Sequence, residues 1–282
     1  MPPITDPAAM TQACVLTQQD FDRFADLSGD HNPIHVDPAF AAGTPFGATV
    51  SHGMLLFSRL RGLIARQYPG LPLASQTLMF PAPCYADEPL TLALTPESTP
   101  NGQGIALRTE VIKADGSLGL RGSCVLRRTA DTGRPPHADA GPAQPLATPP
   151  ATPAPCPAPG LDRYLALRHG DSAALERRYT PTDHALWAAL ADSPVVPAEL
   201  PEPLIPAMFS CLLGEELPGH GTNYLKQSLN FLAPAQAGET LHASVTVSRL
   251  RADKALVNLH TRCTGADGRL LCHGEALVLF RQ

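Results

Sequence analysis

The chain has 282 residues, of which 44% are hydrophobic and 17% are charged. This length favours two modest domains or one large one, and the composition excludes collagen, a coiled coil and wholesale disorder. The formal net charge is −5, from 21 Lys and Arg against 26 Asp and Glu. Because no stretch is dense in Lys or Arg, we expect no nucleic-acid partner, although a small anionic ligand stays an option.

The cysteines and the apolar stretches suggest where the protein works. Seven cysteines are scattered without a C-x-x-C pair, which fits reduced core thiols and a cytoplasmic setting better than disulfides or a zinc ribbon. The first ten residues carry no basic residue and no apolar core of the kind that a signal peptide needs. The most apolar long stretch, GMLLFSRLRGLIA, contains Arg59 and Arg61, so we expect no membrane partner.

The first half of the chain predicts two helices followed by strands. A short amphipathic helix is expected over about residues 17–27, and a longer apolar helix over about 53–67. Residues 105–111 then alternate between apolar and polar, as a strand does. One buried helix followed by antiparallel strands predicts an α+β fold in which the sheet wraps around the helix.

Between the two predicted helices lies the run DHNPIH, in which Asp30 and His35 are five residues apart. Pro33 lacks an N–H and disfavours a helical conformation at Asn32, so we expect a fixed loop in which Asp30 and His35 face each other. A carboxylate and a neutral imidazole that converge on one point are suited to activate a water molecule.

His52 and Gly53 stand at the start of the longer helix. The first N–H groups of a helix have no partner within it and the helix dipole is positive there, so the Gly53 N–H is a candidate donor to an oxyanion. Close packing at a helix start is the alternative role for Gly53. His52 either contacts the substrate or caps the loop.

Proline is abundant, with 31 residues, and unevenly distributed. The 28 residues from Gly133 to Gly160 include ten prolines and seven alanines. Such a segment buries little apolar surface and has few N–H donors, so it predicts an extended linker. We therefore divide the chain into a domain over 1–130, a Pro/Ala-rich linker over 131–160 and a second domain over 161–282.

The second domain repeats the first. QTLMFPAPCYADEPL (76–90) and QSLNFLAPAQAGETL (227–241) share eight of fifteen residues without a gap, so duplication explains the likeness better than chance. The copies diverge in one place, where the second lacks 11 residues and has no counterpart of the DHNPIH run. This asymmetry is expected of an enzyme with one working site and one supporting half.

The run FADLSGDHNPIHVDPAFA, followed by FG and SHGM, resembles the hydratase 2 motif of the MaoC-like dehydratases, the (R)-specific enoyl-CoA hydratases of hot-dog fold. The second copy resembles the same family through GTNYLKQSLNFLAPAQAGETL and GEALVLF. The resemblance implies a tandem double hot-dog, with two long helices each wrapped by an antiparallel sheet. It also implies (R)-specific hydration of trans-2-enoyl thioesters, or the reverse dehydration of 3-hydroxyacyl thioesters.

Within this resemblance, Asp30 and His35 match the catalytic pair that deprotonates water and returns a proton to the α-carbon. Gly53 matches the residue whose N–H polarises the thioester carbonyl. The resemblance implies an acyl-CoA or an acyl group on acyl carrier protein (acyl-ACP) as the substrate, one active site per chain, and no cofactor and no metal. A homodimer of two double hot-dog chains is a further expectation. Further candidates for substrate binding are Ser28, Asn32, His52, Leu56, Phe57 and Leu60.

Other interpretations stay open. His31 and His35 are four residues apart, but Pro33 interrupts the helix that would align them on a metal, and no third ligand is evident. An acyl thioesterase of hot-dog fold and a non-catalytic acyl-binding or supporting subunit are the rival functions. Plain core packing is the alternative for the residues assigned to the acyl chain, and the shortened second copy gives the hypothesis of a tunnel widened for a bulky chain.

Overall fold

The computed structural model describes residues 9–99, 104–128 and 166–280. The first half contains β1 (Met10–Cys14), α1 (Gln18–Ser28), α2 (Pro33–Val36), α3 (Pro38–Ala42), α4 (Gly53–Gln67), β2 (Leu73–Met79), β3 (Leu90–Glu97), β4 (Ile105–Lys113) and β5 (Leu118–Leu126). The second contains β6 (Ser172–Arg178), α6 (Pro181–Ala191), α7 (Leu204–Cys211), the π-helical turn η1 (Leu212–Glu216), β7 (Thr222–Phe231), β8 (Thr240–Arg251), the 3₁₀ turn η2 (Ala252–Lys254), β9 (Leu256–Gly265) and β10 (Leu270–Phe280). The predicted linker lies outside the described residues, so the domain boundaries stay predictions.

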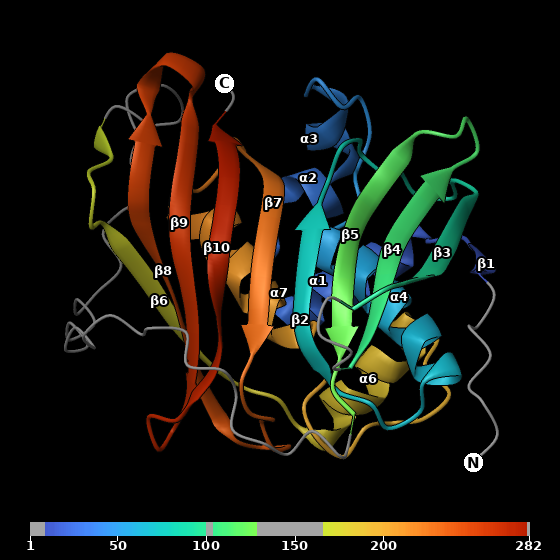
Figure 1. The fold of residues 1–282 in the computed structure, drawn as a ribbon. Helices are drawn as coiled ribbons and strands as arrows, with labels where there is room; N and C mark the ends of the chain where they lie inside the picture. Colours follow the sequence, from blue (N-terminus) through green and yellow to red (C-terminus); the bar gives the residue numbers. More distant parts are fainter. Residues whose placement is uncertain (1–8, 100–103, 129–165, 281–282) are drawn as a thin grey trace, which may run out of the picture.

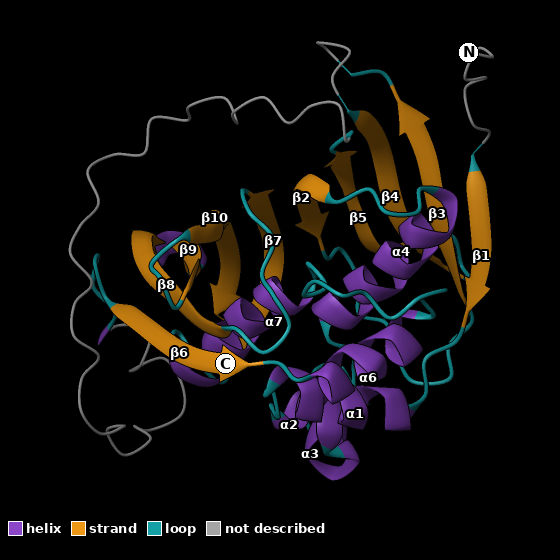
Figure 2. Ribbon diagram, turned by 90° about the horizontal axis from the view of Figure 1, so that it is seen from below, coloured by secondary structure: helices purple, strands orange, loops and turns teal. Residues whose placement is uncertain are grey.

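The strands form one antiparallel sheet in the order β1-β3-β4-β5-β2-β7-β10-β9-β8-β6 (Figure 1). The first five strands belong to the first half and the last five to the second, and each half uses the same order outward from the centre. Pairing of β2 with β7 joins the two halves. Seen from below, the sheet curves around α4 and α7, with α1, α2, α3 and α6 on the open side (Figure 2).

The centre of the sheet lies where Thr77 of β2 pairs with Ser228 of β7. These two residues are equivalent in the repeat, so the halves are related by an approximate two-fold axis through this pair. Gly122 and Gly274, also equivalent, flank it on β5 and β10. A Cβ on either glycine would lie 1.8 Å from the carbonyl oxygen of Thr77 or of Ser228, so both positions require glycine.

The helices begin where the sequence predicts because their caps are encoded locally. Thr17 and Asp20 form a capping box at α1, and Thr180 and Asp183 form the same box at α6. The predicted helix over 53–67 is confirmed as α4, which is buried along most of its length. Helices of one half also pack against helices of the other half: α1 packs against α7, and α6 packs against α4.

The sequence expectation was wrong about the segment around Pro33, which is not a loop but the first turn of α2. Proline is tolerated at the first helical position, where its missing N–H needs no partner. Asn32 caps this turn by accepting a hydrogen bond from the Ile34 N–H at 3.2 Å. The edge strands β1 and β6 and the short helix α3 were not foreseen.

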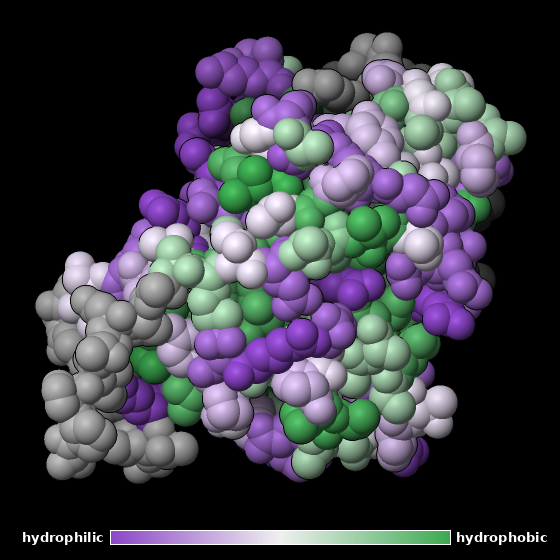
Figure 3. Space-filling view, turned by 90° about the vertical axis from the view of Figure 1, so that its right-hand side faces the viewer, coloured by the Kyte–Doolittle hydropathy of each residue, from purple (hydrophilic) through white to green (hydrophobic). Residues whose placement is uncertain are grey.

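On the side of the molecule that faces right in Figure 1, hydrophilic and hydrophobic side chains are interspersed, and the apolar ones lie in small separate groups (Figure 3). Among the described helices, none is long and apolar enough to cross a membrane.

Candidate active site

Asp30 follows the C-terminus of α1 and is 2% exposed. Gly29 ends the helix in the left-handed conformation and turns the chain inward, and the Asp30 N–H donates to Ser28 Oγ at 3.2 Å. Ser210 of α7 donates a hydrogen bond to Asp30 Oδ2 at 3.0 Å. The other carboxylate oxygen, Oδ1, is buried and has no hydrogen-bond partner within the described residues, so it is free to bind a water molecule or a substrate.

His35 lies in α2, and its ring is oriented by the backbone. Nδ1 lies 2.7 Å from the carbonyl oxygen of Val50. Because a carbonyl oxygen only accepts, Nδ1 carries the proton and Nε2 of the neutral ring keeps a free lone pair. A ring nitrogen of His35 lies within 4.8 Å of a carboxylate oxygen of Asp30, so one water molecule can bond to both groups at about 2.8 Å from each.

Gly53 is the first residue of α4, and its N–H therefore has no acceptor within the helix. The ring of Phe80 packs directly on this residue. A Cβ at position 53 would lie 2.6 Å from Phe80 Cε1, which explains why the helix begins with glycine. The Gly53 N–H is thus available to a substrate oxygen beside the aromatic ring.

Asp30, His35 and Gly53 line one cavity of about 150 Å³. Both halves of the chain build its walls, because residues of η1 and of the start of β7 line it together with residues of α2 and α4. The lining is mixed. Besides these three groups its polar members are Asn32, Ser51, Ser210, Thr222 and Asn223, and its larger apolar and aromatic members are Ile34, Phe46, Leu56, Phe80, Leu213 and Tyr224.

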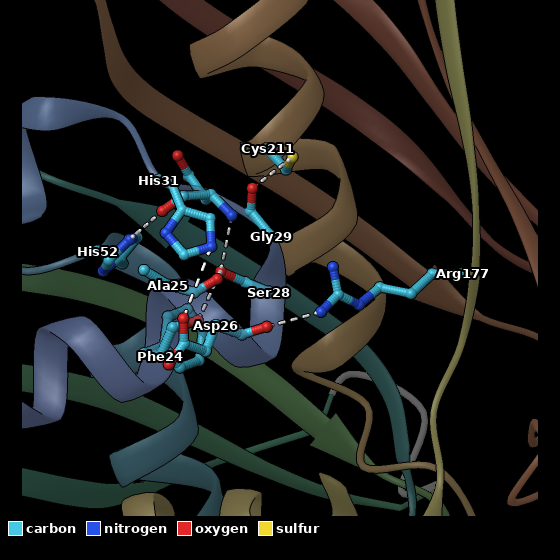
Figure 4. Close-up of polar contacts among 10 residues, drawn as sticks. Phe24, Ala25, Asp26, Ser28, Gly29, His31, His52, Arg177 and Cys211 are labelled. Carbon is cyan, nitrogen blue, oxygen red and sulfur yellow. Dashed lines mark hydrogen bonds and ion pairs between the residues drawn. The ribbon is translucent and has the colours of Figure 1, made fainter.

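The second half also holds the segment that carries Asp30. Besides the Ser210 hydrogen bond, three contacts among the described residues cross between the halves in this region, and Figure 4 shows two of them, Cys211 with Gly29 and Arg177 with Asp26. The three contacts are Asn32 Nδ2 to Gly214 O (3.3 Å), Cys211 Sγ to Gly29 O (3.4 Å) and Arg177 Nη2 to Asp26 O (2.8 Å). The half without the motif therefore fixes the position of the half that has it.

His52 lies behind the two candidate catalytic residues and is 1% exposed. Its ring stacks on that of His35, with centroids 3.8 Å apart and an interplanar angle of 28°. Its Nε2 lies 2.9 Å from the backbone carbonyl oxygen of Asp30. Burial and the neighbouring His35 lower the pKa of His52 to about 3, so this imidazole is neutral at physiological pH.

Asp30, His35 and His52 bring three potential metal ligands together, with one donor atom of each within 4.8 Å of the others. A histidine binds a metal along a lone pair in its ring plane, with the ion about 2 Å from the nitrogen. The rings of His35 and His52 are stacked and nearly parallel, so their lone pairs do not converge on one ion at that distance. This arrangement does not fit a metal held by both histidines.

The structure brings together some of the predicted site residues and separates others. Asp30, Asn32, His35, Gly53 and Leu56 line the cavity. The remaining four are buried and do not border it, so the geometry gives them no contact with a substrate there: Ser28, His52, Phe57 and Leu60.

Ser210 and Gly214 were missed as site residues. Both fall in the match between Phe57-Ser58-x-Leu60-x-Gly62 and Phe209-Ser210-x-Leu212-x-Gly214. That match shows that the segment is repeated, but it does not reveal that Ser210 and Gly214 of the second copy lie beside the segment that carries Asp30.

In the second half, side chains occupy the region that is equivalent to the cavity of the first half. Ile205 stands where the first half has Gly53, and Trp187 Nε1 donates to Ser58 Oγ at 3.1 Å. Arg61 of α4 points into this region and forms a salt bridge to Glu202, with Nε 2.9 Å from Oε2. Burial alone would raise the pKa of Glu202, but the Arg61 guanidinium and hydrogen bonds outweigh it and lower that pKa.

Residues 2–114 match the family model described as MaoC like domain. The (R)-specific enoyl-CoA hydratase of Aeromonas caviae is 37% identical to this chain over 107 residues. The alignment covers 37% of this chain and 80% of the relative. The likeness in sequence is thus carried by about the length of one repeat.

Solved structures resemble nearly the whole chain. One described as a MaoC-like dehydratase has a TM-score of 0.70 and 14% identity, and the match covers 97% of this chain and 98% of that one. A Mycobacterium tuberculosis protein described as having a double hotdog fold has a TM-score of 0.69 and 14% identity, with 98% and 96% covered. At this identity the likeness concerns the fold alone, and the fold is a double hot-dog.

Proposed function

The chain belongs to the MaoC-like dehydratase family, and we propose that it catalyses the (R)-specific hydration of trans-2-enoyl thioesters or the reverse dehydration of 3-hydroxyacyl thioesters. The observation that carries the proposal is that His35, whose Nδ1 is engaged by the Val50 carbonyl so that Nε2 keeps its lone pair, lines the same cavity as Asp30 and Gly53. The similarity to an (R)-specific enoyl-CoA hydratase supports it.

In the proposed reaction a water molecule is held between Asp30 and His35. The Gly53 N–H hydrogen-bonds to the thioester carbonyl oxygen and stabilises the negative charge that develops there. Oxygen of the water bonds to C3 of the enoyl group, the dyad takes the proton from the water, and the dyad returns a proton to C2. The C2–C3 double bond becomes single, and dehydration follows the same steps in reverse.

Each group is suited to this role by its surroundings. Ser210 holds one oxygen of Asp30 and leaves the other without a protein partner. The Val50 carbonyl fixes His35 in the tautomer that can accept a proton at Nε2. The proposed reaction proceeds with protein groups and water. The carrier of the acyl group is CoA or acyl carrier protein, and pairing of two chains as a homodimer stays a prediction.

The test is to incubate the full chain with crotonyl-CoA and follow the enoyl absorbance and free thiol together. Loss of enoyl absorbance without thiol release is the expected result, and a stereospecific 3-hydroxyacyl-CoA dehydrogenase identifies the product as (R). Release of thiol would instead indicate a thioesterase. Binding of crotonyl-CoA without turnover would indicate a non-catalytic subunit.

Variants complete the test. Asp30→Asn and His35→Ala should each lower kcat by about 100-fold or more, because general acid–base groups typically contribute that much. The matched controls are Asp26→Asn and His31→Ala in the same segment, since these side chains are 74% and 57% exposed and pair with each other. Near-normal turnover in either dyad variant would contradict the proposal.

A further inference from the structure

We propose that His52, which does not line the cavity, is the positioning residue for both members of the dyad. This inference rests on the function proposed above. His52 occupies the N-cap position of α4, directly before Gly53, so it is also adjacent to the candidate oxyanion donor. The side chain of this one residue thereby contacts both Asp30 and His35, and its backbone leads directly into Gly53.

The contact with Asp30 is directional. His52 Nε2 lies 2.9 Å from the Asp30 carbonyl oxygen, which has no hydrogen to donate, so Nε2 carries the ring proton (Figure 4). This bond fixes the backbone of the residue whose carboxylate faces the cavity. Ser210 fixes the carboxylate itself. Asp30 is therefore held at both its backbone and its side chain.

The contact with His35 is a ring stack, at 3.8 Å between centroids. His52 is supported from another direction by the ring of Phe24, whose centroid is 5.2 Å away at an angle of 57°. Val50 O holds one edge of the His35 ring, and the stack restricts the ring's tilt. Together these contacts aim Nε2 of His35 at the cavity.

A positioning histidine must stay neutral while its neighbour gains and loses a proton. The charged or titratable groups that face His52 are His35, Asp30 and His31. Burial lowers the pKa of His52 to about 3, so His52 stays neutral and does not repel the imidazolium that forms when His35 takes a proton. Its Nδ1 is buried and has no hydrogen-bond partner within the described residues.

Two substitutions separate the effect of the hydrogen bond to Asp30 from the effect of the ring stack on His35. His52→Gln can keep an N–H donor for the Asp30 carbonyl but loses the ring, and His52→Phe keeps a ring against His35 but loses the donor. His52→Ala loses both contacts. His31→Gln, at a histidine that is 57% exposed, is the matched control for removing a nearby histidine.

For crotonyl-CoA hydration, we expect His52→Ala to lower kcat by about 100-fold while KM changes by less than about threefold, because the substrate does not touch position 52. His52→Gln and His52→Phe should each restore part of kcat. A folded His52→Ala variant with kcat within about twofold of the wild type would overturn the proposal. So would a lower melting temperature with unchanged kcat and KM at low temperature, since that result marks a purely structural role.

A measurement on the unaltered protein covers the case in which the variants do not fold. ¹⁵N NMR should show His52 as the neutral Nε2–H tautomer at pH 5, and the neutral form of His35 as the Nδ1–H tautomer. A His52 that titrates like an exposed histidine would overturn the proposal. If the wild type leaves crotonyl-CoA unchanged, the proposed function fails, whereas this readout still decides the state of His52.

Discussion

Ser58 and Ser210 occupy the same position of the two repeats but bind different partners. Ser210 donates to the carboxylate of Asp30, which belongs to the other half, and Ser58 accepts from the indole of Trp187, also of the other half. One hydroxyl therefore serves the candidate active site, and its counterpart helps to close the equivalent place. The duplication has kept the residue and changed what it does.

Ser210→Ala should lower kcat by about tenfold or more, because a hydrogen bond to a charged group contributes about 1.5 to 3 kcal/mol. Ser58→Ala is the matched control. It leaves the buried Trp187 N–H without a partner and should reduce the free energy of unfolding by about 1 to 3 kcal/mol without lowering kcat. Kinetics with crotonyl-CoA and urea unfolding of both variants separate the two effects. Equal losses of kcat would contradict the assignment.

Gly53→Ala should lower both stability and activity, although alanine has the higher helix propensity. The new Cβ would lie 2.6 Å from Phe80 Cε1, so the ring or the start of α4 must move. A shift of about 1 Å at the oxyanion donor is enough for a roughly 100-fold loss of kcat. Adding Phe80→Ala makes room for the methyl group, and it should recover stability in a thermal unfolding experiment. No recovery would show that the ring contact is not the cause.

Removing one partner of the Arg61–Glu202 pair should destabilise the protein by about 3 kcal/mol, because the remaining charge is left in a largely buried place. The side chains are 13% and 17% exposed, and Glu202 also accepts from the Leu73 N–H at 3.0 Å. Urea unfolding of Arg61→Met and Glu202→Gln measures the effect. Turnover by the folded fraction should stay near normal, because the pair lies in the region of the second half that is equivalent to the cavity. A large fall in kcat would contradict this.

The neutral state of His52 predicts a dependence of stability on pH. Its pKa is lowered from 6.5 to about 3 in the folded protein, so between these values the unfolded chain binds a proton that the folded protein does not. This group's contribution therefore falls as the pH falls from 6.5 toward 3, by about 1.4 kcal/mol per pH unit.

Replacing His52 by phenylalanine removes the titrating group, so the unfolding free energy of His52→Phe should fall less steeply over this interval than that of the wild type. Asp30, His35 and His31 face this position and are present in both proteins, so the difference between the two curves isolates His52. Denaturant unfolding at several pH values measures the difference in slope. Parallel curves for the two proteins would show that His52 does not titrate as expected.

The cavity volume of about 150 Å³ predicts a preference for short acyl chains. A cavity of that size in a protein interior holds a molecule about as large as benzene. A series of trans-2-enoyl-CoAs should therefore give the highest kcat/KM for the shortest chains. Leu213→Ala should shift the optimum to longer chains, because Leu213 forms part of the wall. An optimum at long chains in the wild type would favour the hypothesis of a widened tunnel.

Local pattern was sufficient for the elements whose signals lie within one segment. The apolar spacing over residues 17–27 predicts α1, and the alternation over residues 105–111 predicts β4. The edge strands gave no comparable signal, because β1 is short and β6 alternates only between exposed and half-buried positions. Pro33 was misread because the same residue can end a helix or begin one.

The sequence by itself determined the duplication, because the two halves can be compared residue by residue, and the α+β class, because its patterns lie within single segments. The grouping of Asp30, His35 and Gly53 followed from the resemblance of one stretch of the chain to a family motif. Only the tertiary structure decided what completes that group. Ser210 is 180 residues from Asp30, and it reaches the carboxylate because the pairing of β2 with β7 and the packing of α1 on α7 place it there. Contacts at such separation depend on the packing of whole elements, which no local spacing reveals.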